Sequence, residues 1–189
     1  MFLLHKKPET ELDIDGKIYP INMSFNNILI FFDIIEKTIS SDYDKVVLGL
    51  YQLLGIHLDL NPDELHEVFK YIVENFINEG KNIEAPVDLE GNLMPVKKQD
   101  PVQDLKHDAV HIYASFRQAY NINLFEEHDK MDWREFKALL GGLPEDTSMS
   151  KIIDIRRRPY PKGKHATEER KKLKEAKRAY ALPGVEVES

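Results

Sequence analysis

Apolar residues recur at intervals of three and four through most of this 189-residue chain, and this periodicity constrains its fold more than any other feature. It is typical of amphipathic helices that each bury one face. Three such segments begin after Ser24, Ser41 and Asn61, which are good helix caps. The predicted apolar faces are Phe25, Ile28, Leu29, Phe32, Ile35 and Ile39 in the first segment, Val47, Leu48, Tyr51 and Leu54 in the second, and Leu65, Val68, Phe69, Ile72, Val73, Phe76 and Ile77 in the third.

The second half of the chain predicts four further helices. Asp100 and Pro101 indicate a helix that begins there and runs to Tyr120, because aspartate caps helices and proline fits the first helical position. Another helix is predicted around Met131 to Leu140, and a short one through residues 149–155. A last helix, over residues 167–180, has few apolar positions and reads as solvated.

Residues 9–21 predict a β-hairpin. Leu12 and Ile14 alternate with polar residues, Asp15-Gly16 is a favoured two-residue turn, and Pro20 suits an edge strand. Periodicity fails between residues 81 and 99, where we expect a mobile loop. The predicted fold is mainly α: a compact helical domain of about six helices with a small N-terminal β-hairpin and a basic C-terminal helix.

Charge is strongly polarised along the chain. The net charge is −7, yet residues 151–189 hold 12 basic and 6 acidic residues, which leaves −13 for residues 1–150. We therefore predict an acidic helical domain over residues 1–155 and a basic tail over residues 156–189. Such a chain is suited to docking onto itself, onto copies of itself, or onto a polyanion, and charge alone does not choose among these.

The basic tail supplies the candidate partner-binding residues. They are Arg156, Arg157, Arg158, Lys162, Lys164, Arg170, Lys171, Lys174 and Arg178. Only Tyr160 and Tyr180 accompany them as aromatics, and the sequence pI near 5.5 opposes attraction to phosphates. A protein partner is therefore favoured over nucleic acid.

Catalytic patterns are weak. The chain has no cysteine, which excludes disulfides, thiolate metal sites and a cysteine nucleophile. His107 and His111 stand one helical turn apart, with Asp104 one turn before, but the glutamate and the spaced third ligand of a zinc protease are missing. We interpret both histidines as residues of a polar face. We expect no catalytic residue, no metal and no cofactor, and we expect that the protein is not an enzyme.

The N-terminal apolar run, residues 1–4, is too short for a signal peptide, and the longest apolar run, residues 28–32, is far below the ~20 residues of a membrane span. We therefore expect a cytoplasmic protein that does not cross a membrane.

Several longer motifs resemble a known family. Residues 108–124 read DAVHIYASFRQAYNINL, and residues 131–156 read MDWREFKALLGGLPEDTSMSKIIDIR. The hairpin segment IDGKIYPIN, residues 14–22, and the basic helix before ALP at residues 181–183 complete the pattern. Together they resemble the gene-product-fifteen family of tailed phages and prophages of Gram-positive bacteria. The residues that match its motifs are Tyr113, Phe116, Trp133, Phe136, Leu139 and Leu140.

The resemblance implies a siphophage tail-region protein encoded just before the tape measure, with the role of a tail assembly chaperone in the cytoplasm of the bacterial host. Its expected partner is the tape measure protein before tube polymerisation, with other tail proteins, a second chaperone or self-association as additions. The main alternative is a structural virion component of the tail or the head-tail connector. A nucleic-acid-binding protein that acts through the basic tail is the lesser alternative.

Overall fold

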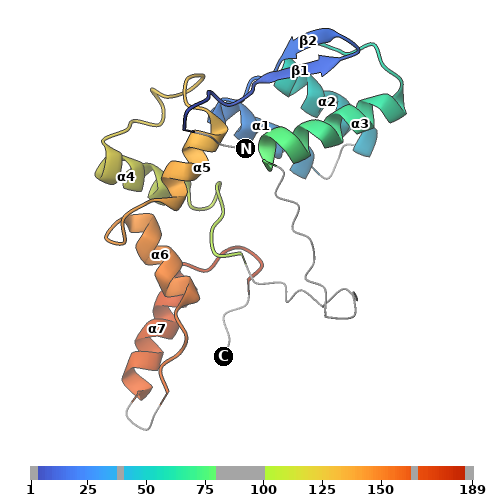
Figure 1. Ribbon diagram of the computed structural model, residues 1–189. Coiled ribbons are helices and arrows are strands. Elements are labelled where there is room, and N and C mark those ends of the chain that lie inside the picture. Colours follow the sequence, from blue (N-terminus) through green and yellow to red (C-terminus); the bar gives the residue numbers. More distant parts are fainter. Residues whose placement is uncertain (1–3, 38–40, 80–100, 163–165, 186–189) are drawn as a thin grey trace, which may run out of the picture. The chain divides into compact units, whose positions relative to one another are not determined.

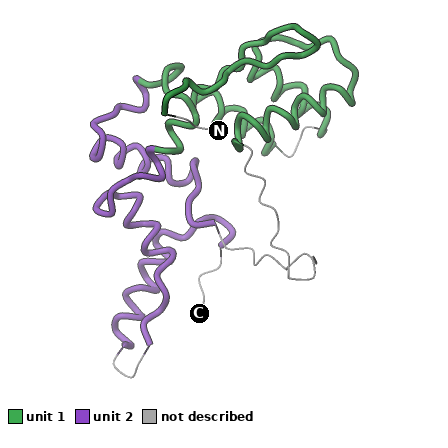
Figure 2. Tube along the Cα trace, viewed as in Figure 1, with its two compact units in different colours: residues 1–86, 127–138 green, residues 87–126, 139–189 purple. Residues whose placement is uncertain are grey.

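The computed structural model describes residues 4–37, 41–79, 101–162 and 166–185 (Figure 1). The loop predicted at 81–99 lies outside these residues, as do Ile39, Asp100 and Lys164. The chain forms two compact units (Figure 2). Unit 1 comprises Met1–Pro86 and Glu127–Ala138, and unit 2 comprises Val87–Glu126 and Leu139–Ser189. The division into domains 1–155 and 156–189 stays a prediction.

The predicted hairpin is present in unit 1. Strands β1 (Glu11–Ile14) and β2 (Lys17–Pro20) pair antiparallel, with Leu12 opposite Tyr19. Asp15 and Gly16 take positive φ angles of 51° and 81°, as a two-residue hairpin turn requires. The Gly16 N–H donates to Asp13 Oδ1 at 2.8 Å, and Leu12 is buried. The turn chemistry read from the sequence is therefore the chemistry that forms the hairpin.

Three helices and a short π-helical turn follow in unit 1: α1 (Phe25–Glu36), α2 (Asp42–Leu54), α3 (Pro62–Ile72) and η1 (Val73–Ile77). Both predicted caps of α2 and α3 are confirmed as capping boxes. Ser41 exchanges hydrogen bonds with Asp44, and Asn61 does so with Glu64. These boxes satisfy backbone N–H groups that have no partner within the helix.

The buried face of α2 differs from the predicted one. Its buried residues are Val46, Gly49, Leu50, Leu53 and Leu54. Leu48 and Tyr51, predicted as core, are 46% and 45% exposed. The reason is Gly49: a Cβ there would stand 3.0 Å from the rings of Phe31 and Phe69, so α2 presents its glycine where those rings need space.

Aromatic rings fill the core of unit 1. Helix α5 (Trp133–Gly141) begins in this unit and contributes Phe136, whose ring stacks on Phe25 with centroids 5.0 Å apart. Trp133 meets Phe32 edge to face at 5.6 Å. The chain before α5 is joined to the chain before α1 by two backbone hydrogen bonds, from Phe25 N to Met131 O and from Trp133 N to Met23 O.

Unit 2 contains α4 (Ala109–Tyr120), α6 (Ser148–Arg157) and α7 (Thr167–Ala179). The predicted start of a helix at Asp100-Pro101 is wrong, because α4 begins only at Ala109. The carboxylate of Asp104 accepts the N–H groups of Lys106 and His107 at 2.8 and 2.6 Å. Asp104 thus caps the turn that leads into α4, and its carbonyl accepts the Asp108 N–H at 2.9 Å.

The buried Ser115 hydroxyl joins α4 to α6 in unit 2, and the buried Thr147 hydroxyl stabilises the turn before α6. Ser115 Oγ donates to the His111 carbonyl at 2.7 Å and accepts the Met149 N–H at 2.9 Å. Thr147, which precedes α6, donates to the Pro144 carbonyl. α6 also contacts α7, whose only buried residue is Leu173.

The fold is mainly α, with a small N-terminal hairpin, as predicted. None of the helices in the described part of the chain has both the length and the apolar character that crossing a bilayer requires.

Candidate partner-binding site

The residues of the resembled motif contribute to the interior of the two units. Trp133 and Phe136 are buried in unit 1, and Phe116 is buried in unit 2. Tyr113, Leu139 and Leu140 are half-buried. The indole N–H of Trp133 donates to the Ile77 carbonyl at 3.3 Å, which links α5 to the end of η1. These positions therefore act through packing.

The candidate basic residues lie at the end of α6, in the segment after it, and along α7. Exposed members are Arg157, Arg158, Lys162, Arg170, Lys171 and Arg178, and Lys174 is half-buried. Lys164 lies outside the described residues. We call the segment from α6 through α7 the basic hairpin. This segment, residues 148–179, carries twelve basic and four acidic side chains, so it is strongly cationic.

Arg156 differs from the other candidates because its guanidinium is turned into unit 2. It binds the Asp108 carboxylate with two hydrogen bonds of 2.7 Å each. The same guanidinium donates to the carbonyls of Val102 at 2.9 Å and Tyr180 at 2.7 Å. Its side chain is 8% exposed and that of Asp108 1%. Arg156 therefore holds the unit together and is not presented to a partner.

The pair of hydrogen bonds from Arg156, which we call the Arg156 clamp, also determines the ionisation of Asp108. Burial raises the pKa of the Asp108 carboxyl, but hydrogen bonds from Arg156 and from the Asp104 N–H, together with the charge of Arg156, outweigh burial and lower the pKa below its ordinary value. The carboxylate is thus charged at neutral pH. Sequence reasoning missed this pair because nothing in the local pattern around either residue indicates the other.

An apolar groove runs between the two arms of the basic hairpin. Its volume is about 480 Å³, and the residues that line it are Ile155, Arg158, Pro159, Pro161, Glu169, Lys172, Leu173 and Ala176. The aliphatic residues and prolines form the apolar surface. Arg158, Lys172 and Glu169 supply the charges, and Arg158 is also paired with Asp154.

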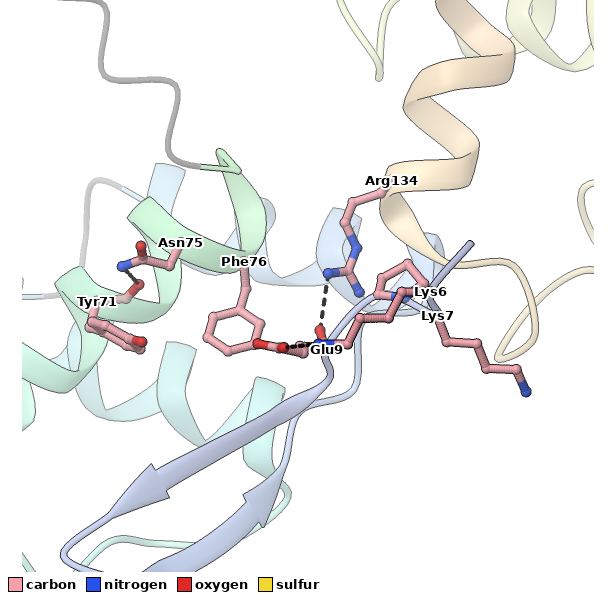
Figure 3. Close-up of a pocket in the computed structure, with 8 residues that line it drawn as sticks. Lys6, Lys7, Glu9, Tyr71, Asn75, Phe76 and Arg134 are labelled. Atoms are coloured by element: carbon pink, nitrogen blue, oxygen red, sulfur yellow. Dashed lines mark hydrogen bonds and ion pairs between the residues drawn. The ribbon is translucent and has the colours of Figure 1, made fainter. Parts of the chain in front are cut away.

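A second pocket, of about 290 Å³, lies in unit 1 (Figure 3). Figure 3 shows Arg134 reaching from α5 to the backbone carbonyl of Glu9, at 3.0 Å. The Arg134 guanidinium is also held by Asp132, and Lys6 pairs with the Glu9 carboxylate at 2.8 Å. Most of the charges at this pocket are therefore compensated within the unit, whereas the basic hairpin has a large excess of one sign.

The histidines that the sequence singled out have different surroundings. His107 is exposed, while the His111 ring lies 3.0 Å from Ser148 Oγ and edge to face with Tyr180. Asp104 is turned to the backbone N–H groups of its own turn. Among the residues with described positions, no three histidine, aspartate or glutamate side chains converge as a metal site would need.

Comparison with known proteins supplies the family. A family model described as Bacteriophage Gp15 protein matches residues 6–182. Comparison with curated proteins and with solved structures gives no match. The matched range includes the hairpin, all seven α-helices of the described chain and the groove residues. Because the match extends over nearly the whole length, the chain belongs to the Bacteriophage Gp15 protein family.

Proposed function

We propose that this phage protein is a tail assembly chaperone that binds the tape measure protein before the tail tube polymerises, in the cytoplasm of the bacterial host. Tape measure proteins are long helical chains whose apolar stripes lack a partner until the tube forms around them. A protein that covers such a stripe temporarily prevents its aggregation. Because this role needs no bond-breaking step and no cofactor, we propose a binding protein and not an enzyme.

The observation that carries the proposal is the apolar groove of the basic hairpin. A groove lined by Ile155, Leu173 and Ala176 offers an amphipathic helix a surface for its apolar stripe, which is a common mode of helix recognition. Family membership supports a phage assembly or structural role, and the groove supports a binding role within it.

Co-expression tests this proposal. The tape measure protein from the same phage genome is produced alone and with this chain, and its soluble fraction and its co-purification are measured. The proposal predicts a soluble complex only when both are present. A tape measure protein that remains insoluble, although this chain is itself soluble and folded, would count against the chaperone role.

The alternative is a structural component of the virion, and particle composition separates the two. A chaperone leaves before the tail is complete, so purified virions should lack this chain. Quantitative mass spectrometry that finds it at a fixed copy number per particle would instead establish the structural role.

A further inference from the structure

The groove of the basic hairpin also has features that specify the chemistry of its occupant, and the inference drawn from them rests on the proposed function. We propose that the groove binds an amphipathic helix whose apolar stripe is flanked by acidic side chains. The helical form, the acidic flanks and the choice of protein over nucleic acid each follow from a separate feature.

The helical form follows from the wall of the groove. Arg158, Pro159 and Pro161 line one side. Proline has no backbone N–H, so this segment is a poor edge for a partner strand, whose pairing requires donors from the wall. Proline also fixes φ, which leaves the wall with little freedom to lose when a partner binds. A helix, whose backbone groups are satisfied internally, is the form that this wall accepts.

The acidic flanks follow from the charges around the groove. Arg158 and Lys172 line it, and exposed Arg157, Lys162 and Lys171 extend the same charge beyond it. Glu169 and Asp154 offset only part of this charge. A helix with glutamate or aspartate beside its apolar stripe would therefore be favoured, and one with lysine at those positions would be repelled.

The preference for protein over nucleic acid follows from the aromatic ring of the hairpin. Proteins that bind single-stranded nucleic acid without sequence preference stack bases on exposed aromatic rings. The half-buried ring of Tyr160 is covered by the cations of Arg170 and Lys177, whose distances to its centroid are 5.7 and 5.2 Å. Tyr160 is thus occupied by the chain's own side chains, and the ring of Tyr180, the other aromatic residue of the basic tail, meets His111 edge to face.

Three labelled synthetic peptides test the inference on the full-length protein by fluorescence anisotropy. The first is an acidic amphipathic helix of about five turns. The second has the same composition with its apolar stripe scrambled, and the third has lysine in place of every acidic residue. We expect the first peptide to bind at least about tenfold more tightly than either of the others. Equal binding of the scrambled peptide would show charge attraction alone and would overturn the inference.

Two groove variants and a matched control sharpen the test. The double variant Arg158→Glu with Lys172→Glu should lose about tenfold affinity for the acidic peptide and gain affinity for the lysine peptide. Ala176→Leu should weaken the binding of both peptides, because the larger side chain fills part of the groove. Lys151→Glu, an exposed charge reversal on α6 that does not line the groove, should change affinity little. Circular dichroism confirms that each variant remains folded, and an unchanged peptide preference in the double variant would contradict the assignment.

Failure of this inference is distinguishable from failure of the proposed function. A tape measure protein that co-purifies equally with the wild-type chain and with the double variant would leave the chaperone role in place and remove the groove from it. If the acidic peptide binds in the groove but the chain does not make the tape measure protein soluble, the groove assignment would stand and the chaperone role would fall. A single-stranded oligonucleotide that displaces the acidic peptide and binds more tightly would identify a polyanion site and overturn the inference.

Discussion

Units 1 and 2 are both helical, but they are held together by different interactions. Unit 1 is joined through aromatic rings contributed by α1, α3 and α5, of which the Phe25–Phe136 stack is the closest pair described. Unit 2 places an ion pair whose two side chains are both buried, and the buried hydroxyl of Ser115, between its segments. The charges differ too: unit 1 holds 10 basic and 19 acidic residues, and unit 2 holds 16 and 14.

The two units should therefore be destabilised by different kinds of substitution. Apolar burial is non-directional and insensitive to pH, whereas a buried ion pair depends on geometry and on the charge of both partners. We therefore expect unit 1 to respond mainly to loss of side-chain volume and unit 2 to loss of charge. Trp133, the only tryptophan, lies in unit 1, so its fluorescence reports on that unit separately from the helical signal of the whole chain.

The largest expected effect is the removal of a ring from unit 1. Phe136→Ala should lower the free energy of unfolding by about 4 kcal/mol, because it leaves a cavity beneath Phe25 and Trp133. Urea unfolding followed by Trp133 fluorescence measures the loss. Phe136→Leu, which retains most of the volume, should cost distinctly less. An equal loss in both variants would mean that something other than the cavity is responsible.

Next in size is the ion pair of unit 2. Arg156→Met should cost about 3 kcal/mol, since it leaves the Asp108 carboxylate buried without its partner. Circular dichroism during urea unfolding gives the loss. Adding Asp108→Asn to this variant should restore part of the stability because the unpaired charge is then removed. If the double variant is less stable than the sum of the two single losses predicts, the clamp does not act through this charge pair.

The stability contribution of the unit 2 ion pair should depend on pH. The pKa of Asp108 is lower in the folded protein than in the unfolded chain, where it is about 4. The stabilisation that the Asp108 carboxylate gives the folded protein is therefore fully present above the unfolded pKa and is lost as the pH falls through the folded pKa. The stability gap between the wild-type chain and Asp108→Asn should therefore be constant near neutral pH and should narrow below about pH 4. A gap that does not depend on pH would contradict the assigned ionisation.

The smallest effect expected to be measurable is at a helix cap. Asn61→Ala should cost about 1 kcal/mol, because the N–H groups of Asp63 and Glu64 lose their acceptor at the start of α3. Lys6→Ala, which removes an exposed ion pair with Glu9, should leave stability nearly unchanged and is the control. Thermal unfolding of the two variants side by side compares them.

Local signals predicted local structure well. The Asp15-Gly16 turn and the Ser41 and Asn61 caps depend on residues within a few positions of each other, and all three form as expected. The phase of α2 was wrong because Gly49 looks neutral in a sequence, while the rings of Phe31 and Phe69, distant along the chain, decide which face is buried. Periodicity alone does not show where a small residue is needed.

The candidate site was predictable only in part. The excess of basic residues after residue 155 is visible in the sequence, and most of those side chains are exposed on the hairpin. The groove was not predictable, because it depends on how Pro159 and Pro161 run beside α7. The clamp of Arg156 on Asp108 joins residues 48 positions apart, and no spacing rule connects them.

Quantitative co-purification of the tape measure protein should be measured with three forms of this chain: wild type, the Arg158→Glu and Lys172→Glu double variant, and Lys151→Glu. If the client binds in the groove, we expect a soluble complex with the wild type and with Lys151→Glu, and a loss of about tenfold or more in recovered tape measure protein with the double variant. Equal recovery with all three forms would show that the groove of the basic hairpin is not where the client binds.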